Sequence, residues 1–124
     1  MVNRSTTWLF ASVRTANERR DTVERFLRAY RKAARLYHDA FTGPDGKRRD
    51  GKDAAEILAL LAKDLDLSLE DVRLGISYID PDGRLDVADV RRQIEWFKMQ
   101  GMVKPGVDTN SIVDMRYVIP LAER

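Results

Sequence analysis

Apolar residues recur at three- and four-residue spacing from Asp21 to Phe41, and basic residues fill the positions between them. The apolar positions are Val23, Phe26, Leu27, Tyr30, Ala34, Tyr37 and Phe41. This spacing predicts a long amphipathic helix over residues 21–42 with these side chains on its inner face. Asp21 followed by Glu24 forms a capping-box-like start, and the turn residues 43–46 (GPDG) end the helix.

The same periodicity predicts four shorter helices, over residues 52–65, 69–77, 87–100 and 109–118. Ser68 and Asp86 are each followed three residues later by an acid, as at helix starts, and Gly101 stands where a left-handed C-cap is expected. The apolar run WLFASV predicts one short strand over residues 6–13. We therefore expect a mainly α fold, with about five helices preceded by one N-terminal β-strand, in a single helical domain over residues 1–124.

Composition narrows the classes of function. The chain has 124 residues, 44% of them hydrophobic and 34% charged, and no apolar run approaches the roughly twenty residues of a membrane span. We therefore expect no membrane span. The chain has no cysteine, which excludes disulfides, thiolate nucleophiles and Cys-based zinc sites.

Charge is distributed unevenly along the chain. Residues 14–52 carry twelve Lys and Arg against six Asp and Glu, whereas residues 53–95 carry five against eleven. The simplest interpretation is two solvated helix faces that attract each other within the fold or between copies. The alternative is a phosphate-backbone site on the basic side chains Arg25, Arg28, Arg31, Lys32, Arg35 and Lys47-Arg48-Arg49. The helix aromatics fall on its apolar face and not beside these arginines, so we expect no nucleic-acid partner.

The sequence offers no recognisable catalytic machinery. His38 is the only histidine, which excludes a cluster or dyad of imidazoles, and we expect it to be solvated. The spaced carboxylates Glu70 with Asp71 and Asp86 with Asp89 stand at helix starts, where capping accounts for them. The prediction is therefore a protein that is not an enzyme and carries no cofactor.

One segment is similar to the calcium loop of EF-hands and dockerins. With Gly83 as the sixth loop position, acids occupy the third, fifth, ninth and twelfth positions; they are Asp80, Asp82, Asp86 and Asp89. The first position is Tyr78, where the cation needs a carboxylate, and Pro81 stiffens the loop. We therefore predict a Pro-Asp-Gly turn before a helix capped by Asp86, and no metal site.

Four segments together resemble the C-terminal part of one protein family. They are ERFLRAYRKAARLYHDAF (24–41), DAAEILALLAKDLDLSLEDV (53–72), IDPDGRLDVADVRRQIEWFKMQGMVKPGVD (79–108) and IVDMRYV (112–118). Their order and spacing are similar to those of ABC-importer substrate-binding proteins of the nitrate, sulfonate, taurine and thiamine-precursor family. The resemblance implies the C-terminal helical portion of a type II periplasmic binding protein, in which two α/β lobes hold the solute between them.

The resemblance also sets expectations about partners. The parent family is periplasmic or lipid-anchored, and its partners would be an ABC permease and a small anionic or sulfonated solute. The segment Trp8–Val13 is too short for an export signal, so we expect this chain to be cytoplasmic or an expressed fragment. Most ligand contacts of the family lie in lobes that this segment does not supply, so no substrate-binding residue is assigned. Self-association through Trp8–Val13 and exposed helix faces is expected. The alternatives are an autonomous helical protein-interaction module and a dockerin-like calcium module.

Overall fold

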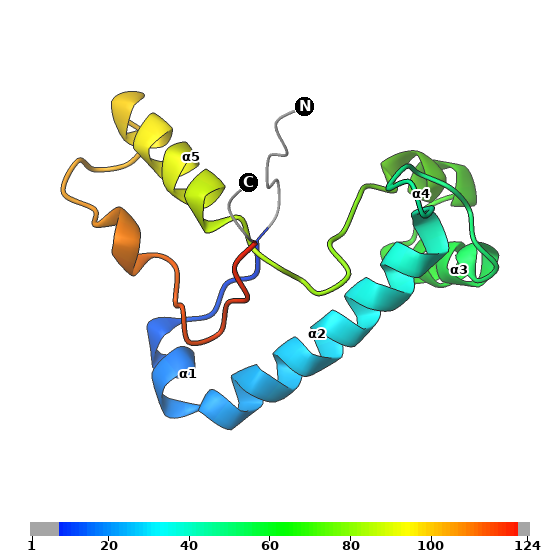
Figure 1. The fold of residues 1–124 in the computed structure, drawn as a ribbon, viewed down its shortest axis with the longest axis horizontal. Coiled ribbons are helices and arrows are strands. Elements are labelled where there is room, and N and C mark those ends of the chain that lie inside the picture. Colours follow the sequence, from blue (N-terminus) through cyan, green and yellow to red (C-terminus); the bar gives the residue numbers. More distant parts are fainter. Residues whose placement is uncertain (1–7, 122–124) are drawn as a thin grey trace. The chain divides into compact units, whose positions relative to one another are not determined.

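The computed structural model describes residues 8–121, and these are mainly helical, as predicted (Figure 1). The elements are α1 (Val13–Glu18), α2 (Arg20–Phe41), α3 (Ala54–Leu65), α4 (Leu69–Gly75), α5 (Val87–Met99) and the short 3-10 helix η1 (Thr109–Ser111). The described residues form no sheet; they contain two isolated β-bridges, one between Thr42 and Arg48 and one between Leu85 and Pro120. No helix among them combines the length and the apolar character needed to cross a bilayer.

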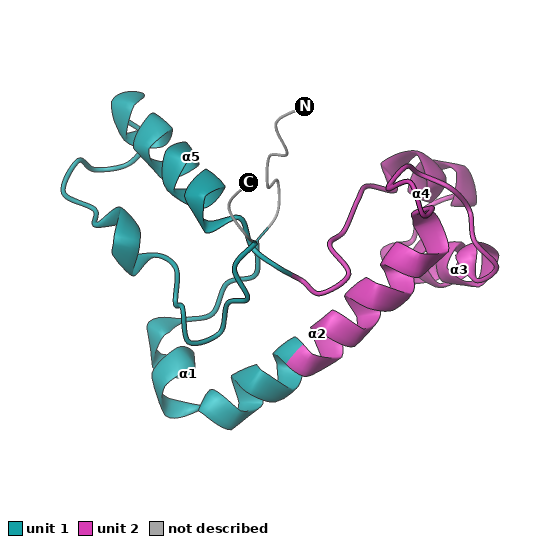
Figure 2. Cartoon of the chain, in the orientation of Figure 1, with its two compact units in different colours: residues 1–27, 84–124 teal, residues 28–83 magenta. Residues whose placement is uncertain are grey.

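The chain divides into two compact units (Figure 2). Unit 1 comprises residues 1–27 and 84–124, and unit 2 comprises residues 28–83. Helix α2 contributes its first turns to unit 1 and the remainder to unit 2. The prediction of one domain over residues 1–124 stays a prediction.

The predicted N-terminal strand is wrong where the structure describes it. Residues 8–12 have no regular structure and Val13 begins α1, while residues 6–7 lie outside the described part. A strand needs a neighbour to pair its backbone groups, and the described residues supply none here. Ser12 starts a helix instead, because its hydroxyl accepts a hydrogen bond from the Thr15 amide at 3.0 Å.

The predicted last helix is also largely wrong, because only its first three residues form a 3-10 turn. The Asp108 carboxylate accepts from the Asn110 amide at 2.9 Å, and Asp114 accepts from the Arg116 amide at 3.1 Å. These local bonds satisfy backbone donors in turns and so compete with a continuous helix.

In unit 2, α3 packs against α4, and the last turn of α2 joins them in a buried cluster. The buried cluster consists of Ala40, Phe41, Ala54, Leu58 and Val72. Tyr37 lies edge-on to Phe41, with ring centroids 4.9 Å apart. This cluster holds the end of α2 against the segment that follows α4, and the hollow described below lies between them.

Phe26 was predicted on the inner face of α2, but it is 57% exposed. At 100° per residue Phe26 lies about 40° from Tyr30, on the same side of α2, but it stands in the first turns of the helix, which belong to unit 1 and not to the buried cluster of unit 2. The apolar side of α2 is therefore covered near Phe41 and exposed at Phe26.

The loop after α2 turns back and caps the helix. The amides of Arg49 and Gly51 donate to the carbonyls of Phe41 and Ala40, at 3.0 and 2.7 Å. These carbonyls belong to the last turn of α2 and have no partner inside the helix. Gly51 lies so close that a Cβ there would stand 2.8 Å from the Asp39 carbonyl oxygen.

Unit 1 is held together by its C-terminal segment. The Tyr117 hydroxyl donates to the Ala16 carbonyl in α1, and the Arg116 guanidinium donates to Asn17 Oδ1 at 2.7 Å. Leu85, just before α5, donates to the Ile119 carbonyl and accepts from Leu121, at 2.9 and 2.8 Å. Residues 116–121 thus connect α1 with the start of α5.

Candidate functional site

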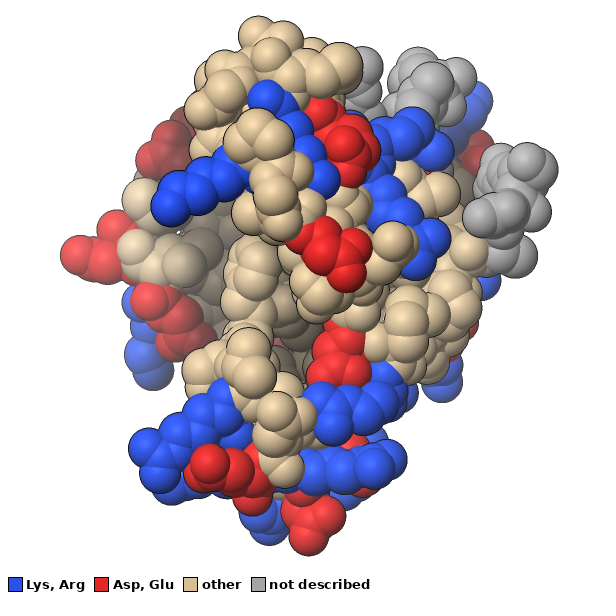
Figure 3. Space-filling view, turned by 90° about the vertical axis from the view of Figure 1, so that its left-hand side faces the viewer, with Lys and Arg blue, Asp and Glu red and all other residues tan. Residues whose placement is uncertain are grey.

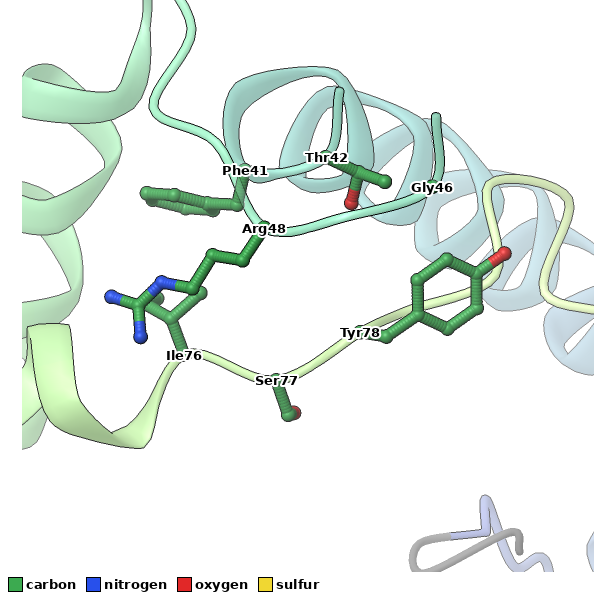
Figure 4. A pocket seen from close by; sticks show the side chains of 7 residues that line it. All are labelled: Phe41, Thr42, Gly46, Arg48, Ile76, Ser77 and Tyr78. Carbon is green, nitrogen blue, oxygen red and sulfur yellow. The ribbon is translucent and has the colours of Figure 1, made fainter. Parts of the chain in front are cut away.

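A small hollow lies in unit 2 between the end of α2 and the segment after α4 (Figure 4). Its lining residues are Phe41, Thr42, Gly46, Arg48, Ile76, Ser77 and Tyr78. The hollow holds about 50 Å³, whereas pockets for small molecules usually hold roughly 300 to 1,000 Å³. It accommodates a water-sized group and not a metabolite.

The polar groups around this hollow are used to hold its walls together. The Arg48 guanidinium donates to the Arg73 carbonyl in the last turn of α4, and Arg73 in turn pairs with Asp50 at 2.5 Å. The Ser77 amide donates to the Tyr37 hydroxyl oxygen at 3.2 Å. These contacts join α2 and the loop after it to α4 and the residue segment that follows α4. Their role is therefore to stabilise the fold.

A second depression, of about 520 Å³, lies at the junction of α1 and α2 in unit 1 and is largely open to solvent. Consecutive residues from 17 to 22, together with Arg25, line it. One ion pair of this region joins Arg20 and Glu24 at 2.8 Å, on the first turns of α2. An open depression of this kind buries too little of a small ligand to select it.

The first two acids of the calcium-loop look-alike belong to unit 2. Asp80 accepts a hydrogen bond from the Asp82 amide at 3.0 Å, which closes the predicted turn. Asp82 makes an ion pair with Arg35 of α2. Gly83 completes the turn with φ of +61°.

The other two acids, Asp86 and Asp89, belong to unit 1 and serve α5. The Asp86 carboxylate accepts from the Asp89 amide at 2.8 Å, which is the predicted N-cap. Asp89 is 4% exposed and accepts from Gln93 at 2.8 Å and from Arg92 at 3.2 Å. In the part of the chain that the structure describes, no three His, Asp or Glu side chains gather as metal ligands would.

His38 lies in the last turn of α2, and its side chain is half-buried. Its Nδ1 is 3.2 Å from Asp39 Oδ1, and its ring meets the Tyr78 ring edge-on with centroids 5.8 Å apart.

The predicted basic helix face is present, and several of its cations have no partner among the described residues. Arg25, Arg28 and Lys32 make no hydrogen bond or ion pair there, whereas Arg35 is paired with Asp82. On the face drawn in Figure 3, Lys and Arg side chains are mixed with Asp and Glu. The basic face of α2 therefore contains both paired and unpaired cations.

Two ion networks in unit 1 were not anticipated from the sequence. Lys98 donates to Glu95 at 2.8 Å and to the Thr109 hydroxyl at 2.9 Å. Hydrogen bonds from Lys98 and Thr109 to Glu95 lower the pKa of the Glu95 carboxyl. Hydrogen bonds from Arg116 lower the pKa of Asp114 in the same way. The spacing of three along α5 was the available signal for the first network.

Comparison of the chain with protein-family models, with curated proteins and with solved structures gave no match. Its function therefore has to be inferred from its own residues and from the contacts described above.

Proposed function

We propose that this chain is the C-terminal helical segment of an importer's substrate-binding protein, of the nitrate, sulfonate, taurine and thiamine-precursor type. In this role it is not catalytic, and it does not bind solute alone. Its contribution is to cover and stabilise the lobe of which it forms a part, and the complete protein would deliver a small anionic or sulfonated solute to an ABC permease.

The observation that carries the proposal is the amount of apolar surface left open. Seventeen large apolar side chains of the described residues are exposed, and Leu9, Phe10 and Val13, where a strand was predicted, are 51%, 82% and 78% exposed. Large exposed apolar areas on a protein mark surfaces that another part of the protein or another molecule covers. In the parent family this segment would pair with and pack against the first lobe.

The described residues form no enclosed pocket of solute size, which agrees with this proposal. The enclosed hollow of unit 2 holds about 50 Å³ and its polar groups are engaged with one another. Two lobes are needed to surround a solute in the parent fold, so a segment that only supports one lobe has no need of a pocket.

A graft tests the proposal. The corresponding C-terminal segment of a family member is replaced by this chain, and solute binding is measured by calorimetry with nitrate, taurine and an alkanesulfonate. The same family member cut before the segment is the control. We expect the graft to fold and bind the host's solute and the truncated control to fail. A graft that remains unfolded, or a truncated control that binds as well as the graft, contradicts the proposal.

The second candidate is an autonomous helical interaction module, and one observation favours it. Unit 2 encloses its own cluster around Phe41 and Leu58, which are 2% and 3% exposed. A folded monomer of the whole chain, with cooperative urea unfolding and no gain in stability from the missing lobes, would favour this candidate over the importer segment.

A further inference from the structure

Unit 2 has an exposed apolar stripe on the outer side of α2, next to unpaired cations. Ala29, Ala33 and Leu36 follow one another at four- and three-residue spacing, and Leu36 is 55% exposed. Arg28 and Lys32 lie along one edge, and neither has a hydrogen bond or ion pair among the described residues. We name these five residues the basic stripe.

The chemistry of the basic stripe favours a protein surface over a phosphate backbone. Two alanines let another backbone approach closely, and Leu36 offers a side chain that a phosphate does not use. The aromatics Tyr30 and Tyr37, which would stack on bases, lie half-buried on the other face of α2. The partner expected here is therefore acidic and carries exposed apolar side chains.

Unit 2 itself exposes such a surface where α3 joins α4. Residues 64–70 read Asp-Leu-Asp-Leu-Ser-Leu-Glu, and Leu65, Leu67 and Leu69 are 58%, 50% and 57% exposed. Asp64 and Glu70 have no hydrogen bond or ion pair among the described residues. We name residues 64–70 the acidic leucine turn.

We propose that the basic stripe of one copy of this chain binds the acidic leucine turn of a second copy. In this contact Arg28 and Lys32 of one copy face the acids of the other copy's turn. Each side also buries leucine that is exposed in the single chain. Two basic stripes facing each other would instead bring Arg28 and Lys32 against their own copies. The contact joins two different surfaces of the chain. After it forms, one copy still has a free acidic leucine turn and the other a free basic stripe, and these two either bind each other or each bind a further copy.

This inference does not rest on the proposed function, because both surfaces lie within residues 28–83 and use no importer component. It is tested on the full chain by sedimentation equilibrium at about 100 µM, where a dissociation constant in the micromolar range gives a populated assembly. We expect association in about 50 mM salt and a clear weakening in about 500 mM salt, because exposed charges are then screened.

Two charge-reversed variants make the test specific. One carries Arg28→Glu with Lys32→Glu, and the other carries Asp64→Lys with Glu70→Lys. Each alone should associate at least about tenfold more weakly than the original chain. Their equimolar mixture should recover association, because the acidic stripe of the first meets the basic turn of the second, and the first keeps an acidic turn for the second's basic stripe.

A control variant, Arg91→Glu with Lys104→Glu, has the same change in net charge as the first variant but lies outside both surfaces. It should associate like the original chain, and circular dichroism should show equal helicity in all four proteins. A monomeric original chain in low salt, or a mixture that does not recover association, overturns the proposal. So does an original chain that stays monomeric but binds anionic vesicles or duplex DNA through Arg28 and Lys32, since the occupant is then not a second copy.

Discussion

Replacing Gly51 by alanine tests the close return of the chain over the end of α2. The added Cβ would stand 2.8 Å from the Asp39 carbonyl oxygen and 3.4 Å from that of Ala40. Both neighbours are backbone atoms of a helix, so they cannot rotate away as a flexible side chain would. The loop has to move outward instead, which stretches the 2.7 Å bond from the Gly51 amide to the Ala40 carbonyl.

The cost follows from this geometry. Ordinary contact begins at 3.4 Å, so the loop must shift by about 0.6 Å. Overpacking of this kind costs about 1 to 3 kcal/mol, and the weakened hydrogen bond belongs to a class worth about 1 kcal/mol. We expect Gly51→Ala to lower the free energy of unfolding by about 2 kcal/mol. With a urea slope of about 1 to 1.5 kcal/mol/M, the unfolding midpoint falls by about 1.5 M.

Urea unfolding followed by circular dichroism at 222 nm measures this change, and Gly75→Ala is the matched control. Gly75 ends α4, and nothing lies within 4 Å of a Cβ built there. Alanine at Gly75 should therefore leave stability unchanged or raise it by up to about 1 kcal/mol. If Gly51→Ala unfolds at the original midpoint while Gly75→Ala behaves as expected, the loop does not pass this close to α2.

Three further changes probe other local contacts. Asp66 ends α3 with φ of +53°, so Asp66→Gly should raise the free energy of unfolding by about 0.5 to 1 kcal/mol; an unchanged urea midpoint would contradict a strained cap. Tyr117→Phe removes the hydrogen bond to Ala16 and should lower stability by about 1 kcal/mol in the same assay, and no loss would mean that this bond is not formed. Arg116 holds the pKa of Asp114 below its usual value, so the pair stabilises the fold above the ordinary aspartate pKa and this contribution is lost as the pH falls through the lowered pKa. The thermal midpoint of Asp114→Asn should therefore lie below that of the original chain at pH 7, and the gap should narrow as the pH falls below the ordinary aspartate pKa; a gap that stays constant throughout the acid range would refute the assignment.

The sequence predicted the helices best where a strong apolar period and a cap coincide. The hydroxyl of Ser68 and the carboxylate of Asp86 accept from amides three residues later, as predicted, and Gly101 has φ of +72° after α5. Helix α1 was missed because its six residues, VRTANE, carry no apolar stripe. Its start depends on one local bond to Ser12, which periodicity does not reveal.

The contacts around the candidate site were beyond sequence reasoning because they join distant residues. Arg35 pairs with Asp82, 47 residues away, and Arg48 caps the end of α4 at Arg73, 25 residues away. Residue spacing gives the neighbours of a side chain along its own helix and says nothing of such pairs. The exposure of Phe26 has a related origin, because periodicity places it on the apolar side of α2 but does not show which turns of the helix other segments cover.

The contacts made by residues 116–121 determine the order in which the chain can fold during synthesis. Unit 2 is continuous in sequence, so its parts are all available once residue 83 has left the ribosome. Unit 1 cannot close until residue 117 has been made, because Tyr117 meets Ala16 across a separation of 101 residues. Closing a flexible loop of that length costs about 4 kcal/mol in chain entropy. While this loop is open, the segment around Ala16, which is buried in folded unit 1, is accessible to chaperones and proteases.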